Sequence, residues 1–398
     1  MTRLPLRHPG VAAIIALGFS LLPLATDTTV AALPGLRAHF GVSTSLAQLT
    51  LSVFMAAFAV SQLLYGPLSD RFGRRPILLG GLAVFLLASL ACTLAGSIES
   101  LIVARFFQAV GCCAPTVIGR AIVRDVHGAE GTARMMAYIS AGMSLLICLW
   151  PIIGGQLVQQ FGWRAVFALH ALVGGGMLSA AAFLVTESNP HLNPAATEVL
   201  RTLRNYRTLL ADRRFVGYAA CNAFGFGAIV SFLSGAPFVL IGRLGIAAWE
   251  FGLLLGLAIV GYVLGSLTTA RLVTRIGIDR MLRAGTAVGA AAGAGMFALA
   301  FAGVHTVAAV IVPYFVFLIA TGLNQPTAMA GAIGPFPRMA GTSSALLGFL
   351  QLGSGALIGY LVGRMDHGTP VPMAAAIALC TLGVLASYYL IVRGGARE

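Results

Sequence analysis

The stretch GPLSDRFGRRPILLGG, Gly66 to Gly81, joins two long apolar runs and decides how the whole chain is interpreted. It combines glycines that allow a tight turn with one acid and three arginines. A second stretch, ARLVTRIGIDRMLRAG from Ala270 to Gly285, repeats it at an offset of 204 residues, which aligns Arg71 with Arg275. Such a repeat, at the corresponding loop of each part, predicts a chain built from two related halves.

The composition predicts that lipid surrounds most of the chain. Of its 398 residues 58% are hydrophobic and only 9% are charged, which is too little polar surface for a water-soluble protein. An apolar run of about 20 residues crosses a bilayer as a helix. Twelve such runs are found, at 11 to 33, 47 to 66, 76 to 96, 101 to 123, 133 to 157, 165 to 186, 215 to 240, 248 to 271, 281 to 303, 305 to 328, 341 to 363 and 371 to 392. We therefore expect an all-α integral membrane protein with twelve transmembrane helices in two pseudo-symmetric six-helix bundles.

The basic residues predict the orientation. All 25 are arginines, and with the N-terminus inside, twenty fall in cytoplasmic segments and one, Arg105, within a span. The outside receives Arg37, Arg164, Arg243 and Arg364. By the positive-inside rule, we expect a multi-pass protein of the plasma membrane, the inner membrane of a bacterium, with both termini in the cytoplasm.

The longest polar stretch, 187–214, predicts a cytoplasmic linker between an N-terminal bundle at 1–186 and a C-terminal bundle at 215–398. The net charge of +13 comes from short arginine tracts between apolar runs, which fits contact with membrane lipid rather than nucleic acid. The six cysteines lie within apolar runs without metal-ligand spacing, so no metal and no cofactor is expected. No nucleophile and base pair is visible, which disfavours an enzyme. We expect a monomer.

The loop from Gly66 to Gly81 resembles the loop motif of the major facilitator superfamily. The matching residues are Gly66, Leu68, Asp70, Arg71, Gly73, Arg74, Arg75 and Pro76. An acid and three guanidiniums on a tight turn can bridge helix ends across the interface of two bundles. The resemblance implies a cytoplasmic gate in which Asp70 and the arginines engage helix ends and an acid near helix four, here Asp125. Alternatively, the arginines only hold the loop inside; both interpretations are compatible.

Four further stretches narrow the resemblance to the Bcr/CflA drug-resistance transporters. They are RAIVRD (Arg120 to Asp125), GWRAVF (Gly162 to Phe167), FLSGAPFVL (Phe232 to Leu240) and AGTSSALLGFLQ (Ala340 to Gln351). The resemblance implies proton-coupled export of small drugs, with bicyclomycin, phenicols and sulfonamides among family substrates, or of cysteine-like metabolites.

Two departures from the family pattern concern helices four and five. Arg105, Gln108 and Gly111 fit the helix-four pattern, but Ala109 stands where Gly is common. In helix five, Trp150 replaces the Gly of the antiporter motif. The motif residues that remain are Pro151, Gly154 and Gly155. These departures bear on the direction of transport rather than on the fold.

Asp27 and Arg105 are the charges that stand out within the predicted spans, where a charge marks a pathway or a partner. Asp27 lies in SLLPLATDTTVAALPGL between Pro23 and Pro34, a sequence that favours a bent helix with a polar face. We expect Asp27 to carry the coupling proton, since a partly desolvated carboxyl group can load and release one as access alternates. The alternative is a structural Asp that is hydrogen-bonded to a neighbouring helix.

Arg105 keeps its proton, so its expected role is electrostatic. It either favours the ionised form of Asp27 or binds an anionic group of the substrate; the alternative is a fixed hydrogen-bonding post between helices. Gln108, at i+3, is expected on the same face of the helix. The histidines His170 and His305 are expected near helix ends, at the membrane interface.

A drug cavity needs apolar walls with a few convergent polar groups. The candidates are Gln108, Asn222, Phe226, Phe232, Asn324, Gln325 and Gln351. Phenylalanines at helical spacing also serve simple packing. We expect one cavity between the bundles and a proton-driven exporter of small molecules. A substrate-proton symporter that imports a nutrient is the main alternative, and a membrane enzyme is a more distant one.

Overall fold

The computed structural model describes residues 9–189, 192, 199–336, 339–365 and 369–393. For 9–12, 124, 127–145, 147–148, 199–202, 274 and 340–341 it describes the backbone alone. Within these ranges the chain is helical and has no strand. The longer elements are α1 (Pro9–Val30), α2 (Leu33–Phe40), α3 (Thr44–Phe72), α4 (Arg74–Thr93), α5 (Ile98–Phe161), α6 (Trp163–Leu184), α7 (Val199–Ala211), α8 (Arg213–Pro237), α9 (Ala248–Ile276), α10 (Ile278–Phe301), α11 (Val307–Ile333), α12 (Ala340–Arg364) and α13 (Val371–Ala386). Two short π-helices, η2 (Phe238–Arg243) and η4 (Ser387–Val392), extend α8 and α13.

Eleven helices among the described residues are long and apolar enough to cross a membrane, and they match eleven of the predicted spans. The remaining span, 133–157, falls in α5, where the side chains of 127–145 lie outside the described residues. The first predicted span, 11 to 33, is wrong at its end. Helix α1 stops at Val30, and Leu33 begins the separate short helix α2. Pro34 lies in the first turn of α2, where proline is favoured.

The 64-residue helix α5 turns back on itself. A straight helix of this length would be about 96 Å long, roughly three times the hydrocarbon thickness of a bilayer. Yet Arg164, just beyond its end, donates to the carbonyl oxygen of Ala95, just before its start, at 3.3 Å. Gly119 packs on Ile15 near the start of α1, and Gly154 packs on Thr28 near its end. The two helices expected at 101–123 and 133–157 are therefore one continuous helical element, without the expected loop between them.

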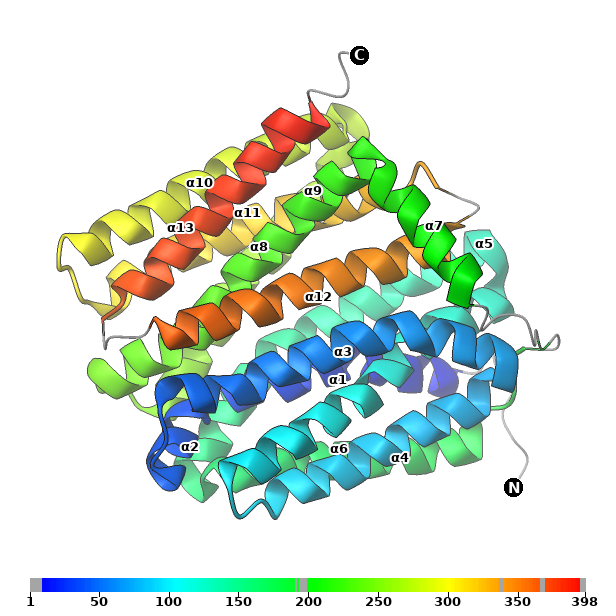
Figure 1. The fold of residues 1–398 in the computed structure, drawn as a ribbon, viewed down its shortest axis with the longest axis horizontal. Coiled ribbons are helices and arrows are strands. Elements are labelled where there is room, and N and C mark those ends of the chain that lie inside the picture. The colour runs from blue at the N-terminus through cyan, green and yellow to red at the C-terminus, as the bar shows by residue number, and fades with distance from the viewer. Residues whose placement is uncertain (1–8, 190–191, 193–198, 337–338, 366–368, 394–398) are drawn as a thin grey trace.

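Helices α1 to α6 gather in one group and α8 to α13 in another, with α7 between the groups at one end (Figure 1). The pairs α3 with α12 and α5 with α9 make the most extensive contacts between the groups. We call the end that carries α2 the α2 end, and the end that carries α7 the α7 end. The division into domains at 1–186, 187–214 and 215–398 stays a prediction.

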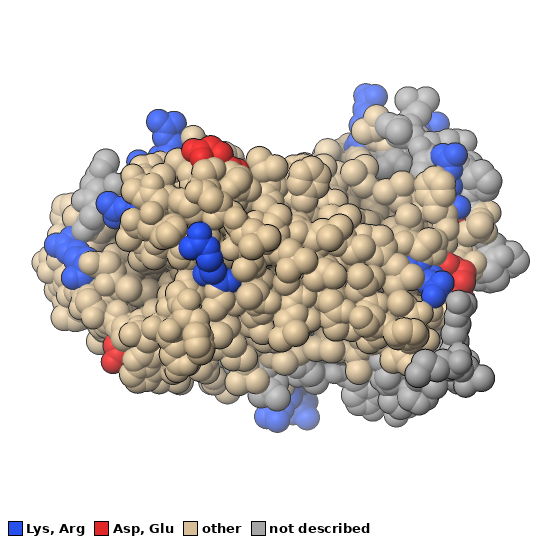
Figure 2. Space-filling model, turned by 90° about the horizontal axis from the view of Figure 1, so that it is seen from below, with Lys and Arg blue, Asp and Glu red and all other residues tan. Residues whose placement is uncertain are grey.

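The outer surface carries many exposed large apolar side chains. Leu94, Leu172 and Leu379 are 81%, 74% and 69% exposed. On the face seen in Figure 2 charged side chains are sparse, and wide uncharged areas separate them. Because soluble proteins rarely expose apolar patches of this extent, the surface fits contact with lipid.

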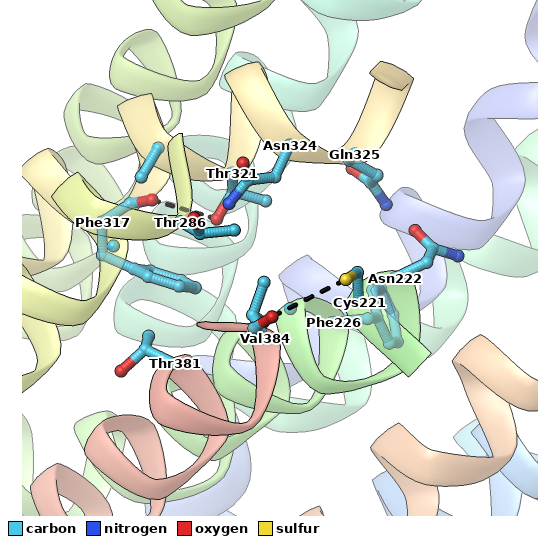
Figure 3. Close-up of a pocket in the computed structure, with 13 residues that line it drawn as sticks. Cys221, Asn222, Phe226, Thr286, Phe317, Thr321, Asn324, Gln325, Thr381 and Val384 are labelled. Carbon is cyan, nitrogen blue, oxygen red and sulfur yellow. Dashed lines mark hydrogen bonds between the residues drawn. The ribbon is translucent and has the colours of Figure 1, made fainter. Parts of the chain in front are cut away.

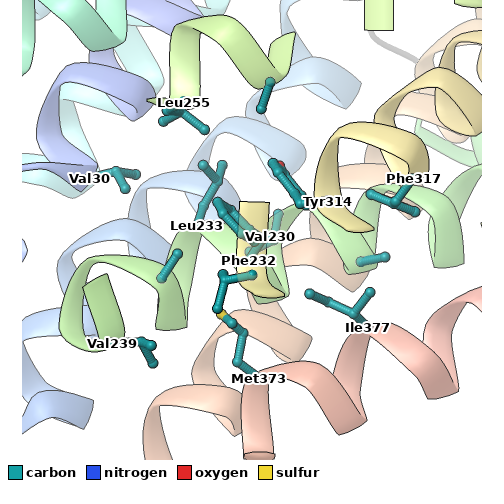
Figure 4. Close-up of a cluster of buried hydrophobic side chains, with 14 of the residues drawn as sticks. Val30, Val230, Phe232, Leu233, Val239, Leu255, Tyr314, Phe317, Met373 and Ile377 are labelled. Atoms are coloured by element: carbon teal, nitrogen blue, oxygen red, sulfur yellow. The ribbon is translucent and has the colours of Figure 1, made fainter. Parts of the chain in front are cut away.

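A buried apolar cluster joins the two groups of helices toward the α2 end. Val30 and Leu51, from α1 and α3, belong to the same cluster as Phe232, Leu255 and Tyr314 of the second group. In Figure 4 Val30 lies at the left edge of the cluster, and Leu255 and Leu233 are the labelled side chains next to it in the view. Burial of such side chains contributes about 1.5–3 kcal/mol each relative to exposure. In this conformation, packing between the groups therefore closes the α2 end.

Gly322 lies at a helix crossing that has no room for a larger side chain. A methyl group there would lie 2.6 Å from the backbone nitrogen of Ser266, at the crossing of α11 and α9. Gly322→Ala should lower the free energy of unfolding by about 1–3 kcal/mol, the usual cost of overpacking. The control is Gly295→Ala in α10, where nothing lies within 4 Å. Thermal unfolding in detergent measures both, and equal melting temperatures would contradict the assigned helix crossing.

Candidate functional site

Asp27 stands half-buried in α1, four residues after the internal proline Pro23. The hydroxyl of Thr26 lies 2.9 Å from its Oδ1 and 3.0 Å from the carbonyl oxygen of Leu22. Since a hydroxyl has one proton, it donates to one of these acceptors at a time. Asp27 also interacts electrostatically with Tyr314 of α11, in the other group of helices. The carboxyl group thus lies where the two groups meet.

Arg105 of α5 is fully buried. Its Nη1 donates to Oε1 of Gln108 at 2.6 Å, and its Nε donates to the carbonyl oxygen of Thr50 at 3.3 Å. The guanidinium lies 4.1 Å from the ring centroid of Phe54, a cation–π contact, and its Nη2 has no partner. Gln108 is therefore on the same helix face, as expected from its i+3 spacing.

The direct pairing of Arg105 with Asp27 is absent from this conformation. The hydrogen-bond partners of Arg105 come from α3 and α5, whereas Asp27 interacts with α11. Neutral groups and an aromatic face hold the guanidinium, so it needs no carboxylate in contact.

His170 is more deeply placed than the sequence predicted. It lies two turns into α6, it is fully buried, and both of its ring nitrogens have partners. The expectation of an interfacial position is wrong for His170, because α6 begins at Trp163 and turns this side chain toward α1 and α5. His305, in contrast, follows α10 at the α2 end and is half-buried, in contact with Arg243.

Four of the predicted cavity residues line one small pocket (Figure 3). They are Asn222, Phe226, Asn324 and Gln325. The pocket lies inside the second group, between α8, α10, α11 and α13, rather than between the bundles as expected. Its free volume of about 20 Å³ holds a water molecule rather than a drug. Thr286, Thr321 and Thr381 also line it, and the sequence interpretation missed them.

The other three predicted cavity residues lie elsewhere. Gln351 of α12 accepts a hydrogen bond from the Nδ2 of Asn222 at 3.1 Å, next to the pocket. Phe232 is fully buried in the apolar cluster and stacks on Tyr314, with 3.4 Å between ring centroids. Gln108 is fully buried beside Arg105. Phe232 and Gln108 therefore do not line this pocket, because packing and hydrogen bonds occupy them.

The gate motif forms a compact charged cluster at the α7 end. Arg74 pairs with Asp70 at 2.5 Å and with Asp125 at 3.1 Å, and its guanidinium also donates to Ser69. Gly73, with φ of +97°, provides the sharp turn between α3 and α4 that a side chain would strain. The pairing with Asp125 that the resemblance implied is thus present. Gly66 and Arg71 lie within the last turns of α3.

The gate cluster stays within the first group in this conformation. Arg75 donates to the carbonyl oxygens of Val185 and Ala182 at the end of α6. The partners given above for Asp70, Arg74 and Arg75 also belong to the first group. The expected bridge across the two bundles is therefore not made by these three side chains, because they fold back onto α5 and α6.

The helix-five motif packs at two crossings of α5. A Cβ atom on Gly154 would lie 2.5 Å from the Cα of Thr28 in α1. Pro151 and Gly155 instead face α9, where Gly155 packs on Trp249 and Pro151 on Gly252. The small residues thus let α5 approach both groups of helices closely.

Glu187 is a site residue that the sequence interpretation missed. It follows α6 and accepts hydrogen bonds from the backbone N–H groups of Arg74, Arg75, Ser188 and Asn189. Partial burial of Glu187 raises its pKa, but these N–H groups together outweigh that effect, so the pKa is lowered from its ordinary value of 4.5. Glu187 therefore caps the start of α4 and holds the beginning of the linker on the gate. Glu187 directly follows the predicted span 165 to 186, and this position at a helix end was the sequence signal that could have indicated its role.

Glu187→Gln should lower the free energy of unfolding by about 1 kcal/mol at neutral pH, as for a lost helix cap. Because folding lowers this pKa, the contribution is full above pH 4.5 and disappears as the pH falls through the folded value. Melting curves of variant and wild type in detergent should therefore converge below pH 4.5. Glu99→Gln, at the other end of the molecule, is the control. A constant difference across this range would contradict the capping role.

Comparison with known proteins decides the family. The family model described as Major Facilitator Superfamily matches residues 15–360. The chain belongs to the major facilitator superfamily. It is accordingly a multi-pass membrane transporter of small molecules and not an enzyme, as expected from the loop at Gly66 to Gly81.

Relatives within the superfamily confirm the resemblance to drug-resistance transporters. A bicyclomycin resistance protein homolog of Haemophilus influenzae is 31% identical over 389 residues, which cover 96% of both chains. A chloramphenicol resistance protein of Pseudomonas aeruginosa is 31% identical over 372 residues, 92% of this chain and 87% of that protein. Multidrug resistance protein D of Escherichia coli is 28% identical and covers 84% of both.

Solved structures of the superfamily share the fold. The partially occluded, inward-open xylose transporter XylE of Escherichia coli superposes with a TM-score of 0.76 at 14% identity, over 96% of this chain and 97% of that one. A peptide transporter in complex with alafosfalin superposes with a TM-score of 0.78 at 14% identity, over 99% of this chain and 96% of that one. At these identities the likeness concerns the fold alone.

Proposed function

We propose that the chain is a proton-coupled antiporter that exports small drug-like molecules by alternating access. The observation that carries this proposal is the full-length likeness to relatives named for resistance to bicyclomycin and chloramphenicol. Resistance through a transporter requires removal of the drug from the cell, so export is the direction that accounts for these names.

Asp27 is the proposed proton carrier. It is the only carboxylate placed deep within a span among the described residues, and its charge has only a hydroxyl as a hydrogen-bond partner. When ionised, it accepts the proton of Thr26. When protonated, it donates to the Oγ1 of Thr26, whose hydroxyl then donates to the carbonyl oxygen of Leu22. Both states are thus satisfied locally, which suits a group that exchanges protons repeatedly.

Alternating access is the proposed motion of the two groups about a central site. The apolar cluster at the α2 end closes one side, and the gate cluster at the α7 end remains within the first group. We place the α7 end and both termini in the cytoplasm, by the distribution of arginines. In the described conformation Arg120 of α5 donates to Ser344 of α12 at 3.3 Å, a contact between the two groups toward this end. In another state of the cycle Asp70 and its arginines would engage the second group.

The proposed substrate contacts lie on the second group, where polar amides converge. Asn222 and Gln351 form a hydrogen-bonded pair, and Gln325 stands beside Asn222 at the edge of the pocket (Figure 3). These amides offer donors and acceptors to a neutral drug, while Phe226 supplies an apolar surface. Arg105, enclosed in the first group, is proposed to act on the electrostatics of proton transfer rather than on the substrate.

Proton-coupled import is the second candidate function. The residue that favours it is Trp150, which is buried where the antiporter motif has Gly. Both candidates use the same fold and the same carboxylate, and they differ in the direction in which substrate moves relative to protons.

Transport into proteoliposomes separates the two. A counterflow screen of a drug panel, with chloramphenicol first, identifies the substrate, and an inside-acid pH gradient is then imposed. Antiport should concentrate the drug in the acidic lumen, against the flow of protons. Symport should deplete the lumen of drug, and that result would overturn the export proposal.

A further inference from the structure

His170 has no part in the mechanism above, although it is a fully buried titratable group with a partner on each side. Its Nδ1 lies 3.2 Å from the Nε2 of Gln108, and its Nε2 lies 2.8 Å from the Oγ1 of Thr28. Gln108 also reaches Ser89 of α4, at 2.8 Å, and all these side chains are fully buried. His170 therefore connects α5 to α1 through α6.

The direction of every hydrogen bond in this chain follows from Arg105. A guanidinium only donates, so the Oε1 of Gln108 accepts from it and the Nε2 of Gln108 must donate. The Nδ1 of His170 is then an acceptor, which makes the imidazole neutral with its proton on Nε2. The Nε2–H group donates to the Oγ1 of Thr28. The hydroxyl of Thr28 in turn donates to the carbonyl oxygen of Leu24 at 2.6 Å. The chain runs one way, from Arg105 to the backbone of α1.

The chain ends on the segment of α1 that carries Asp27. Pro23 interrupts the helical ladder just before this segment, since it has no N–H group to donate to the carbonyl of Phe19. The carbonyl oxygen of Phe19 therefore lacks its helical donor, which weakens the helix in the turn before the segment 24–28. Two hydrogen bonds of Thr28, to His170 and to Leu24, compensate on the side that faces α6.

We propose that His170 is a positioning residue for proton coupling: as a neutral link it holds the Asp27 segment of α1 in a fixed place relative to Arg105. This inference rests on the proposed role of Asp27 and extends it. The charged and titratable groups around the link are Arg105 on α5, Asp27 on α1, and Cys92 on α4 and Cys112 on α5, which both interact with Arg105. Without the link the segment relaxes, and the positive charge of Arg105 acts on Asp27 less strongly.

Ser89 provides a matched control, because it belongs to the same network but lies off the path to α1. Thr28→Val and Ser89→Ala each remove one buried hydroxyl that bonds to this network. His170→Phe removes both bonds of the imidazole in a similar shape. His170→Gln keeps an amide that accepts and donates, and it should restore part of the link.

The test combines transport with a measurement that needs no substrate. In proteoliposomes, the pH profile of chloramphenicol counterflow should move upward by about one pH unit in His170→Phe and in Thr28→Val. The double variant should shift no further than either single variant, because both break one chain. Hydrogen exchange of the segment 24–28 in detergent should accelerate in the same variants. Ser89→Ala should match the wild type in both measurements, and His170→Gln should fall between.

The outcomes separate this inference from the proposed function. Unchanged hydrogen exchange at 24–28 in His170→Phe would overturn the link, and so would equal effects of Thr28→Val and Ser89→Ala. If transport stays proton-coupled in Asp27→Asn, the proposed function itself fails. If Asp27 is essential but the His170 variants keep the wild-type pH profile, only the positioning role is refuted.

Discussion

Asp27→Asn is expected to abolish proton-driven accumulation while sparing drug binding. The amide keeps the shape of the carboxyl group and can accept from Thr26, but it cannot exchange a proton. One proton that crosses 100 mV carries roughly 2.3 kcal/mol, which supports a concentration ratio of about 50-fold. The variant should lose this ratio and retain gradient-free counterflow. Drug accumulation in energised proteoliposomes, with binding measured separately in detergent, gives both quantities.

Asp279→Asn is the control for this prediction. Asp279 lies in the first turn of α10, where it accepts a hydrogen bond from the hydroxyl of Tyr388 at 2.8 Å, away from the proposed path. Its replacement should leave driven transport near the wild-type level. Uphill transport at the wild-type level by Asp27→Asn would remove Asp27 as the coupling site.

Arg105→Gln should have the second largest effect, an upward shift of the pH optimum of transport by more than one unit and a loss of rate of at least about tenfold. The proposed reason is electrostatic: the buried positive charge should favour the ionised form of Asp27, so proton release without it should require a higher pH. The variant also leaves the Oε1 of Gln108 without its donor. Arg105→Lys should recover the charge but not the fork of donors, and so rescue only part of the rate. The pH profile of counterflow beside drug affinity measures these effects.

The alternative for Arg105 predicts a different pattern. If it binds an anionic group of the substrate, Arg105→Gln would weaken drug affinity and leave the pH profile in place. Its enclosure by Gln108, Thr50 and Phe54 is the structural reason to expect the first pattern.

Patterns that depend on the local sequence were predictable. Apolar runs located the membrane helices. The spacing of Arg105 and Gln108 placed both on one helix face, which their hydrogen bond confirms. Each of these inferences needs only helix geometry or the transfer of apolar surface from water. The pairing of the loop arginines with Asp125, by contrast, was expected only from the resemblance to the superfamily.

The partners of buried polar groups were not predictable in the same way. Scarcity of charge shows that Arg105 and Asp27 each need compensation, but not that a neutral amide, an aromatic ring and a hydroxyl provide it. The depth of His170 depended on the start of α6, and sequence boundaries are uncertain by several residues. The gate cluster folds back onto α5 and α6 in one conformation, whereas the sequence encodes every conformation of the transport cycle.

Proton movement on drug entry tests the central claim most directly. Proteoliposomes that contain the protein and a pH-sensitive dye, with no gradient imposed, receive the transported drug outside. Antiport predicts that the lumen becomes alkaline as drug enters and protons leave, and that Asp27→Asn shows no change in lumenal pH. Acidification of the lumen, or drug entry with no pH change in the wild type, would contradict the account.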